Sequence, residues 1–430
     1  MEKYIEVGQI ELGMYVVRLD RPWLETPFMT QGFPVLSKKL IADIAHYCDH
    51  VYINTDEGID LDLAQPFESG ESTLGIDSIP GVDSTALSYS ETAQEVLSVI
   101  ETGQLPKMLV KYVRQSTFVE ESETATEVYK ETRKVVDHAY QCARDDKPID
   151  AEQPKALVQR LVASVIRNPD AASLLANLKS QDSYTADHSM NVCMIALIFG
   201  RHLGLSEEPL NELGLGALLH DIGKMKTPPD ILNKPGKLTD KEMNMMRYHP
   251  TMGRDLLMKS PGISDVVVDI AYSHHERQSG NGYPRGVTGD KVSLFSKMVA
   301  IVDVYDAITS DRCYHQGMIP MDALQNIYKW RGKHFDPYLA EQFIQCIGTY
   351  PVGSIVELSN QEVGIVVSVN QKKRLLPEVM LVRDKHLQPY EPVKYIDLAK
   401  VNEAGTKIEI AKVLSSDEHG IHIQEYIFNI

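Results

Sequence analysis

The pair His220-Asp221 most constrains what this chain can fold into. It ends the apolar run Ala217–Leu219 and is followed by the run Ile222–Lys224. An apolar run of this kind favours a buried helix, and a buried aspartate is costly unless it is paired or coordinated. Neighbouring residues on a helix point about 100° apart, so the imidazole and the carboxylate can face one metal ion from adjacent angles or bridge two ions. The pair therefore predicts a metal centre inside a helical domain.

Residues of the same metal-binding kinds recur along the middle of the chain, most of them inside apolar helical runs or at their ends. The candidate metal ligands are His188, His220, Asp221, His249, His274, His275 and Asp303. A single histidine on a helix is more often structural than a ligand, so the interpretation depends on the whole set, and above all on the two aspartates embedded in apolar helices. Mixed histidine and carboxylate ligation suits Fe, Mn, Zn or related ions. Two such ions close together can clamp a phosphoryl group during in-line displacement and activate a water.

The composition allows an ordinary core and limits the choice of partners. Of the 430 residues, 43% are hydrophobic and 24% are charged, and the formal net charge is -17. This charge argues against a protein that binds a nucleic-acid polymer or an anionic membrane by bulk electrostatics. It allows a small anionic substrate at a site that metals, Lys and Arg make locally positive. The five cysteines are scattered, and we find neither an apolar signal core nor a stretch of transmembrane length, so we expect a soluble, cytoplasmic protein.

Changes in composition and periodicity predict an α+β chain of four parts. We expect a β-rich N-terminal domain at 1–65, a linker with connecting helices at 66–150, a helical domain at 151–348 and a C-terminal β module at 349–430. The N-terminal part alternates short apolar runs with turn residues, and the C-terminal part returns to a period of two. The stretch Glu120–Arg144 is helical and polar on most faces, which fits a solvated connecting helix and an association helix equally well.

The individual elements are predicted from the same patterns. The predicted helices are Ser37–Cys48, Glu120–Arg144, Ala186–Gly204, Leu210–Gly223, Val266–His275 and Leu294–Ser310. The predicted C-terminal strands are Ile355–Leu358, Val363–Val369, Val379–Val382 and Lys407–Val413. The stretch Phe67–Ser90 is rich in Ser, Gly, Asp, Glu and Thr and is predicted to be a linker or loop.

The order and spacing of the ligand types, together with a glycine-rich turn, resemble the HD-GYP subgroup of the HD phosphohydrolase superfamily. The runs that carry the resemblance are His220–Lys224, His249-Pro250, His274–Arg277, Gly280–Pro284 and Asp303–Ala307. The sequence Gly-Tyr-Pro alone would be an ordinary turn, but here it closely follows the paired histidines. The resemblance covers about residues 150–370, and the first fifty or so residues resemble a β-rich domain often found ahead of HD-GYP domains.

The resemblance implies hydrolysis of a cyclic dinucleotide second messenger, chiefly cyclic di-GMP, to the linear dinucleotide. It also implies two divalent metal ions, with Fe or Mn first and Mg, Ni, Co or Zn as alternatives, held by the seven candidate ligands with Asp221 as a bridge. Lys224 and Asp182 match positions that assist proton handling or orient the bridging hydroxide. The matching substrate-binding positions are Lys224, Gly282, Tyr283, Pro284 and Arg312.

Three departures from the family pattern bear on the site. Tyr184 stands where members with three metal ions carry a glutamate ligand, so a binuclear site is favoured. Gln278 and Ser279 replace a usual aromatic residue and a usual aspartate, which alters the fit of the loop to substrate. His315 replaces a usual Arg or Lys, and a neutral imidazole weakens the hold on phosphate as the pH rises.

The sequence leaves other functions and several partners open. A phosphodiesterase specific for 3′,3′-cGAMP would carry the same motifs, and a catalytically silent HD-GYP protein could be a signalling scaffold that binds nucleotide or a partner. The loop at 282–284 argues against an HD enzyme for other nucleotides or monoesters. We expect a cyclic dinucleotide as ligand, and a homodimer through the connecting helices and signalling proteins are further possible partners.

Overall fold

The computed structural model of the chain describes residues 2–11, 14–21, 26, 33–35, 38–54, 110–176, 184–234, 236–310, 317–370, 373–415, 418–421 and 423–427. The chain divides into two compact units, Met1–Ser88 and Tyr89–Ile430. The fold is α+β, as predicted, with a mostly helical domain, strands near the N-terminus and a sheet near the C-terminus. The predicted linker Phe67–Ser90 lies outside the described residues, and so do Asp182, Arg312 and His315.

The first unit contains a four-stranded antiparallel sheet and one helix. The strands run in the order β1-β4-β2-β3. Its elements are β1 Glu2–Glu6, η1 Val7–Gln9, β2 Tyr15–Leu19, β3 Phe33–Pro34, α1 Lys38–Tyr47 and β4 His50–Asn54. Val51 and Ile53, alternate residues of β4, are fully buried, as expected from the period of two of a strand with one covered face. Ile44 of α1 is fully buried as well. The predicted helix Ser37–Cys48 corresponds to α1.

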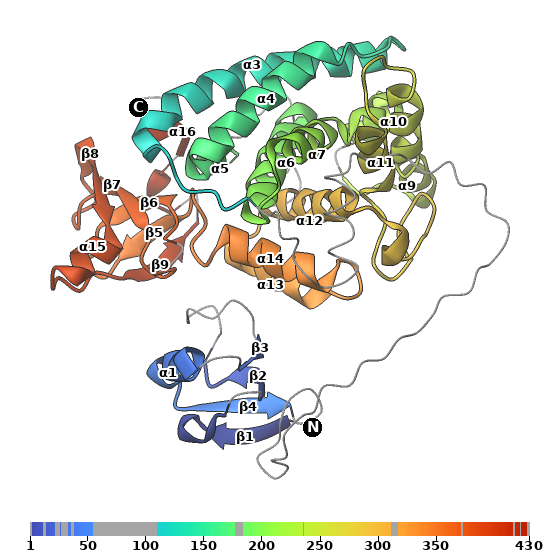
Figure 1. Ribbon diagram of the computed structural model, residues 1–430. Coiled ribbons are helices and arrows are strands. Elements are labelled where there is room, and N and C mark those ends of the chain that lie inside the picture. The colour runs from blue at the N-terminus through green and yellow to red at the C-terminus, as the bar shows by residue number, and fades with distance from the viewer. Residues whose placement is uncertain are drawn as a thin grey trace. The chain divides into compact units, whose positions relative to one another are not determined.

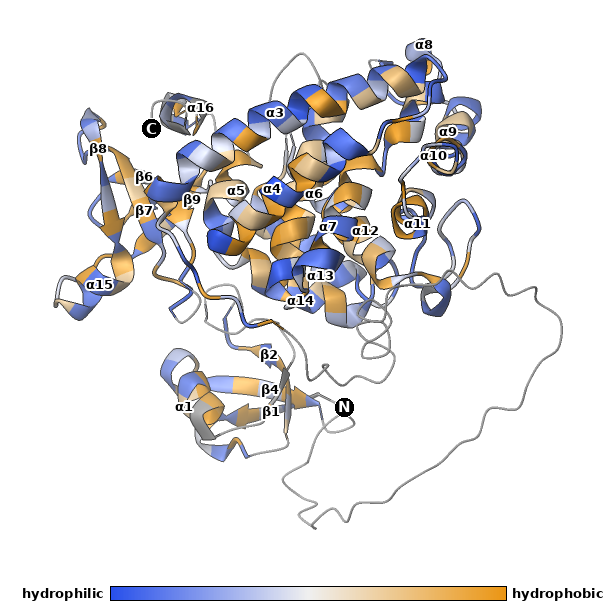
Figure 2. Ribbon diagram, turned by 45° about the horizontal axis from the view of Figure 1, so that its top comes forward, coloured by the Kyte–Doolittle hydropathy of each residue, from blue (hydrophilic) through white to orange (hydrophobic). Residues whose placement is uncertain are grey.

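The second unit begins with a helical domain in which α6, α7 and α12 are central (Figure 1). Its elements are α3 Phe118–Arg144, α4 Glu152–Arg167, α5 Pro169–Leu175, α6 Tyr184–His202, α7 Glu207–Leu219, η3 Ile222–Lys226, α8 Pro229–Leu232, α9 Asp240–Met246, α10 His249–Leu257, α11 Asp265–Ser273, η4 Gly289–Lys291, α12 Leu294–Thr309, α13 Pro320–Trp330 and α14 Pro337–Ile347. Leu197, Leu218 and Ile301, one from each central helix, are fully buried. A helix that is apolar around most of its circumference must be surrounded by others, and Figure 2 shows this composition for α6.

The long helix α3 corresponds to the helix predicted at Glu120–Arg144, and the structure shows what one of its faces packs against. A capping box between Thr117 and Glu120 starts the helix. One face is buried, including Val128, Thr132 and Val136, and the helix contacts α4, α5, α6 and η3. Figure 2 shows hydrophobic and hydrophilic residues alternating along it. The helix is therefore packed on one side and not solvated all round.

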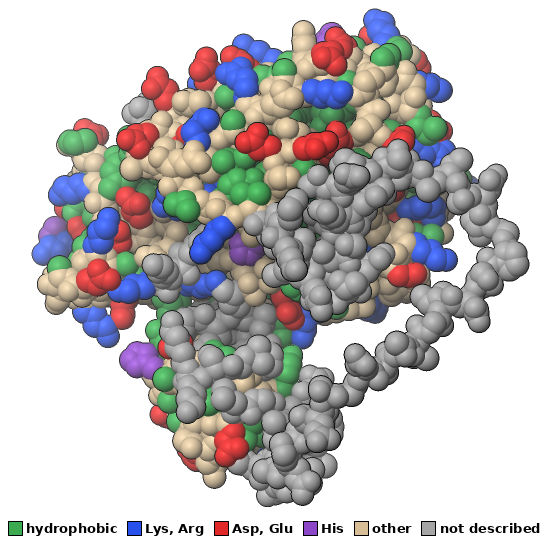
Figure 3. Space-filling view, viewed as in Figure 1, with side chains coloured by type: hydrophobic (Ala, Val, Ile, Leu, Met, Phe, Trp, Pro, Cys, Tyr) green, Lys and Arg blue, Asp and Glu red, His purple; other side chains and the backbone are tan. Residues whose placement is uncertain are grey.

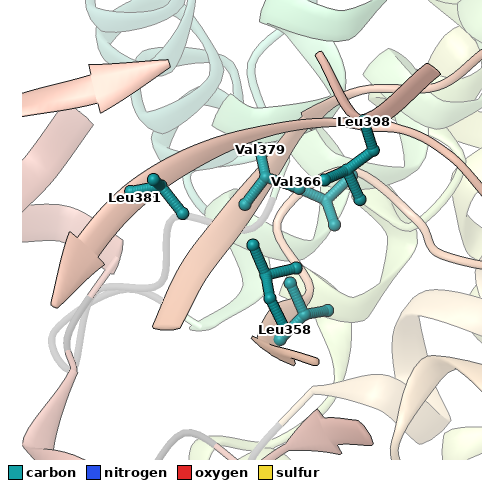
Figure 4. Packing of buried hydrophobic residues seen from close by; sticks show 6 residues of the cluster. Leu358, Val366, Val379, Leu381 and Leu398 are labelled. Atoms are coloured by element: carbon teal, nitrogen blue, oxygen red, sulfur yellow. The ribbon is translucent and has the colours of Figure 1, made fainter. Parts of the chain in front are cut away.

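The C-terminal part is a five-stranded antiparallel sheet in the order β8-β7-β6-β5-β9. Its elements are β5 Ile355–Leu358, β6 Val363–Ser368, β7 Glu378–Arg383, β8 Pro389–Asp397, α15 Leu398–Glu403, β9 Ile410–Leu414, η5 Glu418–Gly420 and α16 Ile423–Ile427. Figure 4 shows part of its core, in which Leu358, Val366, Val379, Leu381 and Leu398 pack together. Arg114 connects this sheet to the helical domain, because its Nη1 donates to Ser368 Oγ at 2.8 Å and its guanidinium pairs with Asp170 of α5.

One predicted element ends at a different residue, and one element of the structure was not predicted. The helix predicted at Leu210–Gly223 ends at Leu219, and a 3₁₀ helix, η3, follows Asp221. The chain tightens here because Gly223 lies against the backbone of α10. Strand β8 was not predicted, since it is mostly exposed and contains Pro389 and Pro392, and prolines of this kind are tolerated only at a sheet edge.

The surface of the second unit carries both signs of charge. Figure 3 shows Lys and Arg side chains interspersed with Asp and Glu side chains over the described part of this face. Among the residues that the structure describes, none of the helices combines the length and the apolar composition needed to cross a bilayer.

Candidate metal centre

The structure brings the seven candidate ligands together in two clusters. The first cluster consists of Asp221, His249, His274 and His275, and the second of His188, His220 and Asp303. The ligand atoms of each cluster lie within 4.8 Å of one another. They come from α6, α10 and α12 and from the C-terminal ends of α7 and α11. Residues far apart in the sequence thus converge because these helices pack around one point.

Asp221 connects the two clusters, because its carboxylate oxygens face different histidines. Oδ1 lies 3.3 Å from His249 Nε2 and 3.8 Å from His274 Nε2. Oδ2 lies 3.5 Å from His188 Nε2 and 3.4 Å from His220 Nε2. A carboxylate that presents one oxygen to each cluster can bridge two cations.

Asp303 faces both clusters in the same way. Its Oδ1 lies 3.1 Å from His188 Nε2 and 3.9 Å from His220 Nε2, and its Oδ2 lies 3.9 Å from His275 Nδ1. Two carboxylates therefore stand between the two groups of imidazoles. The side chains of Asp221 and Asp303 are at least nine-tenths buried.

Helix ends fix the tautomer of three of the histidines. Each places its Nδ1 against the backbone carbonyl three residues earlier, where a helix leaves a carbonyl without an intrahelical partner. The Nδ1···O distances are 2.7 Å from His220 to Ala217, 2.8 Å from His249 to Met246 and 3.0 Å from His274 to Ala271. A carbonyl only accepts, so Nδ1 carries the proton and Nε2 presents a lone pair to the centre. Metal-binding histidines are oriented in this way in general.

His188 is oriented by a carboxylate instead. Its Nδ1 lies 2.7 Å from Asp306 Oδ2, and Asp306 Oδ1 accepts a hydrogen bond from Asn191 Nδ2 at 3.2 Å. Asp306 lies one turn after Asp303 on α12. No role was predicted for Asp306, although a second aspartate three positions after Asp303 in an apolar helix could have indicated one.

The polar atoms of the centre fit cations better than they fit one another. His249 Nε2 and His274 Nε2 are 3.3 Å apart, and with the protons on Nδ1 both atoms offer lone pairs. Among the described residues, the buried atoms His220 Nε2 and Asp221 Oδ1 have no hydrogen-bond partner. Facing lone pairs and unpaired buried acceptors are destabilising, and divalent cations would satisfy all of these atoms at once.

The ionisation of the centre also suits metal binding. Burial lowers the pKa of His274 to about 3, and burial together with neighbouring histidines holds the pKa of His275 well below its usual range. Burial opposes ionisation of Asp221 and Asp303, yet His220 and Lys224 hold the pKa of the Asp221 carboxyl, and His188 that of the Asp303 carboxyl, well below the usual range. For His188, hydrogen bonds to Asp303 and Asp306 outweigh burial and raise the pKa to about 9. A cation that binds here therefore meets ionised carboxylates and displaces a proton from His188.

A glycine brings Asp221 close to His249. A Cβ added at Gly223 would lie 2.0 Å from the carbonyl oxygen of His249 and 2.5 Å from the nitrogen of Gly253. Only a residue without a side chain allows η3 to lie this close to α10. This contact holds together the two elements that carry Asp221 and His249.

The loop at 282–284 lies directly against the first cluster. The Tyr283 ring is 4.6 Å from the His275 ring at 30°, and the Tyr283 amide donates to the His275 carbonyl at 3.2 Å. A Cβ at Gly282 would lie 2.5 Å from the nitrogen of Arg277, so glycine is required for this approach. The peptide bond between Tyr283 and Pro284 is cis.

Glu276 anchors this loop. Its buried carboxylate accepts hydrogen bonds from the backbone nitrogens of Arg285 at 2.8 Å and Val287 at 3.2 Å. Glu276 belongs to the motif run His274–Arg277, but no role was predicted for it. Its position shows why a carboxylate follows the paired histidines, since it holds the loop against them.

Three cationic side chains surround the centre. Lys224 Nζ donates to Asp221 Oδ2 and is partly exposed. The guanidinium carbon of Arg247 lies 5.7 Å from the centre of the Tyr283 ring. Arg277 is half-buried, and burial lowers its pKa against the opposing attraction of Asp303. Arg247 and Arg277 adjoin the predicted motifs in the sequence, but no role was predicted for them.

The structure thus places most of the predicted site residues at one centre. Lys224 and the loop residues Gly282, Tyr283 and Pro284 adjoin the seven candidate ligands. Asp182 and Arg312 lie outside the described residues, as does the side chain of Tyr184.

Three family models match the chain. An HD domain model matches residues 170–339, and a model for a KOW domain associated with HD domains matches residues 355–420. A domain of unknown function (DUF3391) matches residues 2–154. The helical domain that holds the centre is therefore an HD domain.

Curated relatives extend the likeness to almost the whole chain. A cyclic di-GMP phosphodiesterase of Pseudomonas aeruginosa is 34% identical over 403 residues, which cover 94% of this chain and 90% of that protein. A cyclic di-GMP phosphodiesterase response regulator of Xanthomonas campestris is 38% identical over 196 residues, covering 44% of this chain and 52% of that protein. A 3′,3′-cGAMP-specific phosphodiesterase of Vibrio cholerae is 40% identical over 159 residues, covering 37% of this chain and 36% of that protein. The chain belongs to the HD-GYP family of the HD phosphohydrolase superfamily.

Proposed function

We propose that this protein is a metal-dependent phosphodiesterase that hydrolyses cyclic di-GMP to the linear dinucleotide. The observation that carries the proposal is the pair of His/Asp clusters joined by Asp221, whose two oxygens each face one cluster. In the reaction, water adds to phosphorus, the bond from phosphorus to the 3′ oxygen breaks, and that oxygen leaves with a proton. The relative from Pseudomonas aeruginosa, which matches nearly the whole chain, supports cyclic di-GMP as substrate.

The two clusters would hold two divalent ions, with Asp221 between them. Bound there, such ions polarise phosphoryl oxygens and supply a nucleophilic water at neutral pH. The orphaned lone pairs of His220 Nε2 and Asp221 Oδ1 support this assignment. Fe and Mn suit the mixture of imidazole and carboxylate ligands.

The chain's own cations would hold the substrate. Lys224 stands beside Asp221 at the partly exposed edge of the centre and can meet a non-bridging oxygen of the scissile phosphate. Arg247 and Arg277 lie near Tyr283 and can meet the second phosphate, for which a guanidinium offers a planar pair of donors. The Tyr283 ring offers a flat surface next to His275 on which a base can stack.

A second candidate substrate is 3′,3′-cGAMP. A relative from Vibrio cholerae that is 40% identical over 159 residues is named as specific for it. The two substrates differ in one base, so the metal centre would treat them alike.

The test is a product assay on protein purified without oxygen. The metal-free protein is loaded separately with Mn and Fe and incubated with cyclic di-GMP, 3′,3′-cGAMP and cyclic di-AMP. The variant Asp221→Ala is compared with Asp255→Ala, which removes an exposed carboxylate that pairs with Arg254. We expect linear dinucleotide from cyclic di-GMP, loss of product in Asp221→Ala and full activity in Asp255→Ala. Hydrolysis of 3′,3′-cGAMP alone would establish the second candidate, and metal-loaded protein that cuts none of the three substrates would refute the proposal.

A further inference from the structure

The connecting helix α3 reaches the two residues that flank His188. Arg133 Nε lies 3.0 Å from Asp187 Oδ1, and the Tyr140 hydroxyl hydrogen-bonds the Ser189 hydroxyl. All of these side chains except that of Arg133 are buried. The two contacts are seven residues apart on α3, so they lie on the same face, two turns from each other.

These contacts fix the turn of α6 that carries His188 on the side facing away from the metal centre. Successive residues on a helix point about 100° apart, so Asp187 and Ser189 both turn away from the direction of His188. His188 points toward Asp221 and Asp303, while its two neighbours are held by α3. Burial and the nearby Asp221 carboxylate raise the pKa of Tyr140 well above its usual value, so its hydroxyl stays protonated, and either hydroxyl of the pair with Ser189 can be the donor.

The end of α3 makes a second pair of contacts, to the element that follows Asp221. Arg144 Nη2 lies 3.5 Å from Met225 Sδ, and Lys226 Nζ pairs with Asp146 Oδ1 just beyond the helix. Met225 and Lys226 belong to η3, which begins immediately after Asp221. One helix thus contacts both the element that bears His188 and the element that directly follows Asp221.

We propose that α3 positions the metal centre, with Arg133 and Tyr140 as positioning residues that hold His188 in place for one of the two ions. The HD domain model begins at residue 170, so the part of the chain that this model matches lacks α3. The part of the chain needed for a complete metal centre then begins at Thr117, the N-cap of α3, and not at residue 170. This inference rests on the proposed metal centre.

The test is titration of metal-free, full-length protein with Mn²⁺ against a competing chelator. The wild type is expected to take up two ions, and His188→Ala and His274→Ala show which binding step belongs to which cluster. Tyr140→Phe removes one oxygen and leaves the ring, and Arg133→Gln removes the charge, while Arg133→Lys restores it. The matched control is Glu131→Gln, which breaks the half-exposed pair between Glu131 of α3 and Arg160 of α4 and leaves the contacts to α6 intact.

We expect Tyr140→Phe and Arg133→Gln to weaken the step assigned to His188 by about 10-fold, the size seen when support for a metal ligand is lost. In both variants the other binding step should keep its wild-type affinity. Glu131→Gln should bind both ions as the wild type does, and Arg133→Lys should recover most of the affinity lost in Arg133→Gln. A helix that only stabilises the fold would lower the thermal midpoint and weaken both steps equally, or neither, and either result overturns the inference. A wild type that takes up no ion refutes the proposed function as well, so the two failures are distinguishable.

Discussion

Replacement of Gly223 by alanine tests how closely the centre depends on backbone packing. The new Cβ would lie 2.0 Å from the His249 carbonyl oxygen, whereas real Cβ atoms essentially never come within 3.0 Å of a heavy atom. The obstacle is backbone, so η3 and α10 must separate by the difference of 1.0 Å. Overpacking of this kind costs about 1–3 kcal/mol of folding stability.

The separation acts on catalysis because Gly223 is two residues from Asp221 and touches His249 itself. Asp221 Oδ1 and His249 Nε2 are 3.3 Å apart. If η3 and α10 separate by 1.0 Å, these two atoms could no longer bind the same ion with good geometry. A misplacement of about 1 Å costs on the order of 100-fold in rate, which is about 2.7 kcal/mol in the activation barrier at about 1.36 kcal/mol for each factor of ten.

The facing glycine provides the control. A Cβ at Gly253 finds only ordinary contacts, the nearest being Gly223 N at 3.4 Å. Because alanine favours helix over glycine by about 1 kcal/mol, Gly253→Ala should keep activity and be neutral or stabilising. Thermal unfolding, Mn²⁺ affinity and kcat are measured for both variants. Wild-type kcat and metal affinity in Gly223→Ala would show that the packing of η3 on α10 does not set the geometry of the site.

Three further outcomes are expected. Asp306→Ala frees His188 Nδ1 and should weaken metal binding by about 10–100-fold in a chelator competition; unchanged affinity would remove Asp306 from the centre. Glu276→Gln weakens the charge-assisted hydrogen bonds to the loop backbone, so stability should fall by about 1.5–3 kcal/mol and KM should rise, as thermal unfolding and steady-state kinetics would show. Burial lowers the pKa of His202, so the folded state favours the neutral ring and stability is lost as the pH falls below about 6.5. Urea unfolding at about pH 7.5 and about pH 5 should show a smaller pH dependence in His202→Gln, and an equal dependence in both proteins would exclude this histidine as the cause.

Residue types alone identified the seven candidate ligands, because few other functions bring buried aspartates and histidines together on apolar helices. The division into two clusters did not follow from the sequence, since it depends on which way Asp221 and Asp303 direct their oxygens. The tautomers of His220, His249 and His274 could not be predicted either, because they depend on where the helices end. The predicted helix extends through His220 to Gly223. In such a helix the Ala217 carbonyl would accept a backbone hydrogen bond and would not be free for His220 Nδ1, which it meets in the structure.

The packed face of α3 was hidden for a different reason. Several residues on it are polar, among them the buried Glu121 and Thr132. Glu121 is satisfied by Ser164 and Arg167 of α4, and Thr132 bonds the carbonyl of Val128. A pattern of apolar residues cannot reveal a face whose polar groups find partners on the same helix or on a neighbouring one. Strand β8 was missed for the related reason that an exposed edge strand has no apolar alternation to show.

The charge of the centre explains why metal and substrate would bind together. The chain has a formal net charge of -17, yet the proposed substrate carries two phosphates. Helix-end carbonyls keep the proton of three imidazoles on Nδ1, so these rings add ligand atoms without adding charge, while Asp221 and Asp303 add two negative charges. Without ions, the protonated His188 and Lys224 offset these two negative charges, so the centre gives a phosphate little attraction, and Lys224 stays paired with Asp221. Two divalent ions would bring four positive charges against those two carboxylates, leave the centre net positive even after His188 loses its proton, and release Lys224 toward the phosphate.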